Sequence, residues 1–224
     1  MKSLILIVFL SSLWLHTWSQ DNPNLQLIND NISLSVFSDI WQGVPDSIHV
    51  KKINTGFDGA LVYRFKIIPA IDIALGAGIQ VHSMYHNAFI SLNKGDSSIF
   101  TPIAKELAYT KNKLTLTYLK VPVEIRIRNK PEIEQTYKFF IGAEAGWLIS
   151  SYTKYKGDNP ANTSEKVKIK DSRLPNINKL IYCVYTRFGY KEYALTVSYL
   201  LNTIYKTDKG PAIKPISIGI SLML

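Results

Sequence analysis

Two histidines and a serine stand close together in the sequence and are its nearest approach to catalytic machinery. His82, Ser83 and His86 supply a nucleophile and two bases, the residue types that ester or acyl hydrolysis requires. In an extended chain, successive side chains point to opposite faces, so Ser83 lies opposite both histidines. The three therefore cannot assemble on one face of a strand. We predict that the protein is not an enzyme and that these residues are polar positions near one rim of the fold.

The sequence contains no pattern for a metal ion or a cofactor. His49 stands in a polar segment without neighbouring ligands, and the single cysteine, Cys183, has no disulfide partner. The net charge of +9 favours acidic partners, but no dense run of lysine and arginine indicates nucleic acid. We expect no metal, no cofactor and no nucleic-acid partner.

Charged residues that alternate with apolar ones form a second set of candidate functional residues. In the stretch YLKVPVEIRIR (residues 118–128), Lys120, Glu124 and Arg126 share one face of an extended strand. Leu119 and Val123 belong to the opposite face, which is purely aliphatic. This pattern is typical of a strand with lipid outside and a charged lumen inside.

The same alternation recurs along the chain and defines the elements that must position these charges. It predicts strands at residues 31–41, 55–67, 70–85, 114–128, 137–152, 177–190, 193–202 and 213–224. The connections are alternately long and short, and the long segments are 41–54, 86–113, 153–175 and 205–212. Outer-membrane barrels have this asymmetry, with long loops outside the cell. The sequence therefore predicts an all-β fold, an eight-stranded antiparallel up-and-down transmembrane β-barrel.

Aromatic residues support the same fold. Those with outward parity beside the short turns would form one interfacial girdle: Phe65, Tyr137, Phe139, Phe188, Tyr190 and Tyr193. A sparser ring at the other end would contain Phe57, Tyr182 and Tyr199.

The N-terminus has the features of an export signal. Lys2 is followed by an apolar run over residues 4–15 and by small residues around position 19. We expect residues 1–19 to be a signal peptide and residues 20–224 to be the barrel domain, located in the cell outer membrane.

Four stretches have a recognisable pattern: YLKVPVEIRIR at 118–128, FFIGAEAGW from Phe139, RFGYKEYALTVSYLL from Arg187 and GPAIKPISIGISL from Gly210. In these stretches the sequence resembles the PorT-like or porin-like outer-membrane β-barrel family of Gram-negative bacteria. The resemblance covers most of the chain after the signal. The resemblance implies an eight-stranded outer-membrane barrel. It implies no settled activity, although a few members are linked to protein secretion.

Charged residues with inward parity are candidates for a structural network that fills the lumen, because buried charges need partners. They are Arg64, Lys66, Asp72, Lys120, Glu124, Arg126, Glu144 and Arg187. An eight-stranded barrel has an interior just wide enough for side chains. The alternatives are a narrow selective pore and a soluble, lipocalin-like barrel that binds a small ligand inside.

The long segments are the candidate contact surfaces, because a filled barrel offers no route through it. The segment 153–175 is the most basic, and its lysines form a possible partner-binding loop: Lys154, Lys156, Lys166, Lys168 and Lys170. They would meet lipopolysaccharide phosphates or another envelope protein, although composition alone favours a merely solvated basic loop. We expect a monomer that displays its loops for adhesion, assembly or support of protein secretion.

Overall fold

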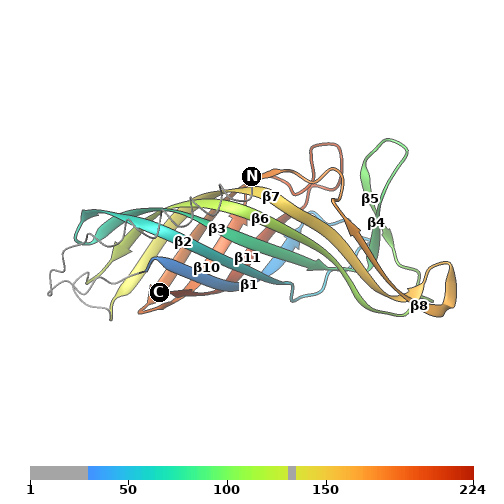
Figure 1. Ribbon diagram of the computed structural model, residues 1–224, viewed down its shortest axis with the longest axis horizontal. Helices are drawn as coiled ribbons and strands as arrows, with labels where there is room; N and C mark the ends of the chain where they lie inside the picture. The colour runs from blue at the N-terminus through green and yellow to red at the C-terminus, as the bar shows by residue number, and fades with distance from the viewer. Residues whose placement is uncertain (1–29, 131–134) are drawn as a thin grey trace, which may run out of the picture.

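The computed structural model describes residues 30–130 and 135–224, within which the chain forms strands joined by turns and loops (Figure 1). The long strands are β1 (Ile32–Gln42), β2 (Thr55–Ile68), β3 (Ile71–Tyr85), β6 (Tyr109–Arg128), β7 (Tyr137–Asn159), β9 (Leu180–Tyr190), β10 (Tyr193–Leu200) and β11 (Lys214–Met223). Three further strands lie at one end: β4 (Ala88–Leu92), β5 (Ser98–Pro102) and β8 (Asn162–Ser172). The predicted signal peptide, residues 1–19, lies outside the described residues.

The long strands close into a ring. Within the described residues the sheet order is β6-β3-β2-β1-β11-β10-β9-β7-β8. Because β6 also pairs with β7, the eight strands other than β8 surround the lumen. Every neighbouring pair is antiparallel, and β1 pairs with β11 over a continuous register from Ser33↔Met223 to Gln42↔Lys214. The predicted eight-stranded up-and-down barrel is confirmed.

The two faces of the wall match the predicted parity. On β6, Val121 and Val123 are 48% and 47% exposed on the outer surface, whereas Lys120 and Glu124 are 2% and 1% exposed in the lumen. The outward apolar belt of this strand ends toward the loops at Leu119, and that of β7 ends at Trp147 and Ile149. In the described part of the chain, no helix has the length and apolar character to cross a membrane.

The short turns lie at one end of the barrel and the long segments at the other. The turn between β9 and β10 contains only Lys191 and Glu192, and Lys191 has a φ of 55°, as tight hairpin turns require. Beside these turns, the Tyr137 ring stacks on Phe188 with centroids 6.0 Å apart and packs against Tyr190 at 5.0 Å. These rings are exposed to the outside, where an interfacial girdle lies.

Two of the segments predicted to be irregular contain strands. Residues 86–113 include the β4–β5 hairpin and the first residues of β6, and residues 153–175 hold the end of β7 together with β8. The polar composition concealed an alternation in which Tyr155, Val167 and Ile169 share one face. Backbone pairing between β7 and β8 carries the wall well beyond the apolar belt, as the right-hand end of Figure 1 shows.

A bulge in β7 separates its membrane-spanning part from this extension. Thr117 pairs with Ser150 and Tyr118 with Leu148, so Ile149 is an extra residue on β7. One added residue reverses the parity of the strand. Below the bulge, Lys138 and Glu144 point inward; above it, Tyr155 faces the inner side, and Lys154 and Lys156 face outward.

Candidate functional site

Ion pairs fill the half of the lumen that is nearest to the short turns. At its base, Asp30 accepts hydrogen bonds from Lys138 Nζ at 2.7 Å and from an Nη of Arg128 at 3.0 Å. Arg128 also pairs with Asp72, whose second partner is Arg64 at 3.4 Å. This first layer joins β2, β3, β6 and β7 to Asp30, which lies two positions before β1.

The second layer is built around Glu124, which is 1% exposed. Arg126 Nε donates to one carboxylate oxygen at 2.7 Å, and the other oxygen accepts from Tyr185 Oη at 2.9 Å and from Arg187 Nη1 at 3.2 Å. Gly142 leaves room for this arrangement, since a Cβ there would lie 2.5 Å from Tyr185 Cζ. Removal of this one carboxylate would therefore leave two buried guanidinium groups without their shared partner.

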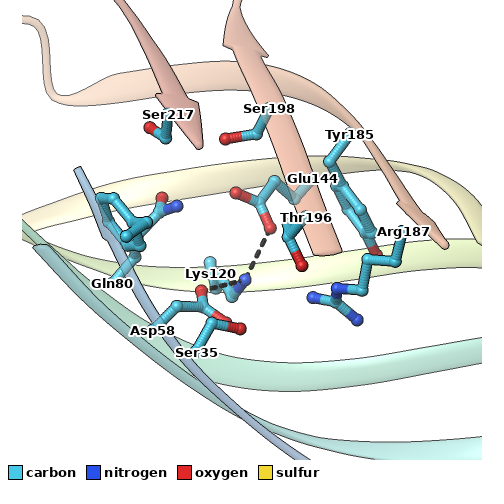
Figure 2. A pocket seen from close by; sticks show the side chains of 11 residues that line it. Ser35, Asp58, Gln80, Lys120, Glu144, Tyr185, Arg187, Thr196, Ser198 and Ser217 are labelled. Atoms are coloured by element: carbon cyan, nitrogen blue, oxygen red, sulfur yellow. Dashed lines mark hydrogen bonds and ion pairs between the residues drawn. The ribbon is translucent and has the colours of Figure 1, made fainter. Parts of the chain in front are cut away.

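The third layer surrounds Lys120, whose ammonium pairs with Asp58 and lies 2.7 Å from Glu144 Oε2 (Figure 2). Hydroxyl groups of Ser198 and Ser217 and the amide of Gln80 line the same space. The cavity that remains is about 20 Å³, close to the least space that holds one water molecule. Side chains therefore fill the lumen at this level.

The structure brings most of the predicted lumen charges together, but it leaves out Lys66. That side chain is exposed at the short-turn end of β2, where a register shift between Lys66 and Ile68 interrupts the pairing with β3, and it lies beyond the enclosed lumen. Asp58, Arg128 and Lys138 belong to the network and were missing from the predicted set, although their inward parity could have identified them. Asp30 precedes the first strand and carries no periodic signal.

The residues that suggested hydrolysis occupy separate environments. His82 Nδ1 lies 2.9 Å from Asp39 Oδ2, and Ser217 donates to the other oxygen of Asp39 at 2.6 Å. Ser83 faces the outer side of the wall, 3.4 Å from Thr115 Oγ1. Ser217 thus contacts the carboxylate and not the imidazole, and Ser83 contacts neither histidine.

Apolar side chains fill the other half of the lumen. The cluster draws on inward positions of the strands and on loop residues that fold over the mouth, and its buried members are Trp41, Met84, Leu114, Leu116, Tyr118, Ile177, Ile181, Cys183, Leu200, Ile204, Tyr205 and Ile213. Tyr205 pairs with Ile177 through an isolated bridge, and Asn178 Nδ2 donates to the Tyr205 carbonyl at 3.0 Å. We call this group the apolar cap. The apolar cap was not predicted, because inward parity was used to identify charged lumen residues only.

The extension of β6, β7 and β8 carries the predicted basic residues together with Lys111 and Lys113, which were not predicted. Lys113 lies opposite Lys154, and Lys154 opposite Lys170. In the next row outward, Lys111, Lys156 and Lys168 are paired in the same way. Lys166 stands one row further out, opposite Asp158. The segment is thus a paired sheet with an ordered lysine surface and not a loop.

Two recesses flank this extension. One of about 260 Å³ lies on its inner side between Phe89, Asn112, Tyr155 and Ile169. The other, of about 370 Å³, is lined by Lys51, Lys111 and His86. Burial lowers the pKa of His86 to about 4, so its ring is neutral at pH 7, and its Nδ1 accepts the Ala88 N–H at 3.3 Å.

Comparisons with known proteins give a family. The sequence matches the profile described as "Outer membrane protein beta-barrel domain" over residues 25–203. Among solved structures, the attachment invasion locus protein Ail of Yersinia pestis, determined in complex with the heparin analogue sucrose octasulfate, is similar at a TM-score of 0.38 and 11% identity, over 86% of this chain and 96% of that one. No curated protein matches the chain. The protein, which is located in the outer membrane, belongs to the outer membrane protein beta-barrel domain family.

Proposed function

We propose that the protein is a non-enzymatic, non-conducting scaffold that presents the β6–β7–β8 extension at the cell surface for binding. The observation that carries the proposal is the contrast between the filled lumen and the barrel wall that continues beyond the membrane. Ion pairs and the apolar cap fill the lumen, whereas the strands continue outside the membrane as a paired sheet. Binding residues concentrate on segments that a rigid scaffold holds in place.

The biological setting of this binding is adhesion, assembly of envelope proteins or support of protein secretion. The resemblance to PorT-like barrels favours the last of these. The protein acts as a monomer in this proposal, because the filled barrel alone supplies the rigid support.

A prediction about conductance separates the scaffold from a pore. Planar bilayers that contain the purified barrel are expected to show no steady single-channel current, since the cavity beside Lys120 is about 20 Å³ and barrels of this size are filled by side chains. Opening the apolar cap by Leu116→Ala and Tyr205→Ala should not produce a current either, because ion pairs still fill the other half of the lumen. A steady conductance of the wild-type protein would refute the scaffold proposal and favour the pore.

A second prediction concerns the partner. Residues 155–169 can be replaced by an Asn-Gly turn, because Tyr155 and Ile169 are opposite each other in the hairpin and Asn-Gly suits a two-residue connection. We expect this variant to fold and insert, since extensions of this kind tolerate shortening, and to lose its partner in crosslinking pull-downs from whole cells.

The control for that experiment is the β4–β5 hairpin, shortened at residues 94–96. This hairpin lies at the same end of the barrel but carries no lysine rows. Heat-modifiability on gels checks that both variants are folded. An unchanged set of crosslinked partners in the β7–β8 variant would contradict the proposed binding role.

A further inference from the structure

Six lysines form two complete rows across three neighbouring strands. Cross-strand pairs in an antiparallel sheet share a face, so Lys113, Lys154 and Lys170 form one row, and Lys111, Lys156 and Lys168 form the next. We call these the lysine rungs. Within the described part of the chain, none of the six lysines forms an ion pair.

Such an arrangement is unfavourable without an anion. Like charges directly opposite each other destabilise a sheet, and the pKa of Lys154 is lowered, with the ammonium of Lys168 as the largest cause. Tyrosine rings offset part of the repulsion, since Lys170 Nζ lies 4.6 Å from the Tyr152 ring centroid and Lys113 Nζ lies 5.6 Å from that of Tyr85. Aromatic faces do not neutralise the charge, so the rungs remain a surface for a ligand with several negative charges.

The order of side chains along the outer wall indicates what kind of anion this is. The outward surface changes from the apolar belt at Leu119 and Trp147 to hydroxyl residues at Thr117 and Ser150, and then to the lysine rungs. A phosphorylated glycolipid presents the same order of chemistry, which is acyl chain, sugar and phosphate. A soluble acidic protein would require no such alignment with the membrane.

The height of the rungs favours a glycolipid over an ordinary phospholipid. Lys113 is six positions beyond Leu119 on β6, which corresponds to a height of about 15 Å at about 3.3 Å per residue and a tilt of about 40°. The headgroup region of a phospholipid bilayer extends only about 5–8 Å beyond the hydrocarbon on each side. Phosphates attached to sugars stand further out, within reach of lysines whose flexible stems bend toward the membrane.

We propose that the lysine rungs bind phosphate groups of lipopolysaccharide on the outward wall of the barrel. This inference rests on the proposed function, because it names the partner of the same extension. The bound lipid holds the β7–β8 hairpin upright against the outer leaflet and neutralises its facing ammonium groups.

The test uses the full barrel in an uncharged detergent, titrated with rough-type lipopolysaccharide and followed by native mass spectrometry. The variant Lys113→Gln/Lys154→Gln/Lys168→Gln is compared with wild type and with Lys94→Gln/Lys105→Gln/Lys206→Gln. The second triple removes the same charge from exposed positions elsewhere on the long-loop end. A lysine near an anionic surface contributes about fivefold to affinity, so the first triple variant should bind lipopolysaccharide about 100-fold more weakly than wild type. The second triple variant should change the affinity little.

A second measurement excludes a purely structural effect of the substitutions. Without lipid, the first triple should slow amide hydrogen exchange across residues 150–172, because repulsion is relieved; in wild type, lipopolysaccharide should produce the same protection. Equal binding by wild type and the first triple, or undiminished binding of lipopolysaccharide stripped of its phosphates, would overturn the proposal. If the first triple instead loses a crosslinked protein and keeps the lipid, the partner is an acidic protein, and the proposed function stands without this inference.

Discussion

Substitution of Glu124 by alanine is expected to destabilise the barrel by about 3–5 kcal/mol, because it breaks a buried ion pair and leaves the other charges without compensation. Glu124 is the common acceptor for Arg126, Arg187 and Tyr185. Removal of the carboxylate leaves both guanidinium groups in a filled lumen. Unfolding by guanidinium chloride in lipid vesicles, read from the gel mobility of the folded form, measures the loss.

Two further variants serve to interpret the loss of stability measured for Glu124→Ala. Glu106→Ala removes an exposed carboxylate and should change stability by less than about 0.5 kcal/mol. The double variant Glu124→Ala/Arg187→Ala should cost less than the sum of the two single variants, since the residues share a contact. A loss below about 1 kcal/mol for Glu124→Ala would mean that water solvates the arginines, and the lumen would then be a hydrated space rather than a filled core.

Substitution of Val123 by arginine is expected to cost about 2–4 kcal/mol, the range for a cation near the midplane of a membrane barrel's lipid face. Val123 lies between Leu75 on β3 and Ala143 on β7 in the middle of the apolar belt. The same unfolding measurement applies, and the variant should still fold in detergent, where the charge can reach water.

The matched control is Thr117→Arg, on the same strand and the same outward face but beyond Leu119. Near the interface, arginine costs only about 0–1 kcal/mol. Equal losses of stability for Thr117→Arg and Val123→Arg would show that the apolar belt does not lie at the positions that parity and exposure indicate.

Periodicity alone was sufficient to predict the barrel. The alternation of Val121, Val123 and Ile125 with Lys120, Glu124 and Arg126 specified the faces of β6, because a wall between lipid and a charged interior enforces a period of two. Local patterns could also predict the outward aromatic residues beside the short turns. These predictions do not depend on which strands pair with each other.

The remaining features depend on pairing between distant segments, which a single sequence does not report. Lys113, Lys154 and Lys170 became one row only through the register of β6, β7 and β8. The bulge at Ile149 reverses the parity of β7, so the period of its membrane part does not predict which face Lys154 and Lys156 occupy. Asp30 lies next to Arg128 and Lys138 because the ring closes and brings them together.

The pairing of β1 with β11 has a consequence for the order of folding. Ser35 and Ser221 are 186 positions apart in the chain, yet their hydroxyl groups lie 2.8 Å apart across this seam. Contacts of such long range carry a high loop-closure cost and form slowly. We therefore expect the seam to form last, after the local hairpins have paired, so that until then both β1 and β11 expose free edges that can pair with other chains. Because one oxygen of Asp39 on β1 accepts a hydrogen bond from Ser217 on β11, closure of the seam also supplies a partner to a buried carboxylate.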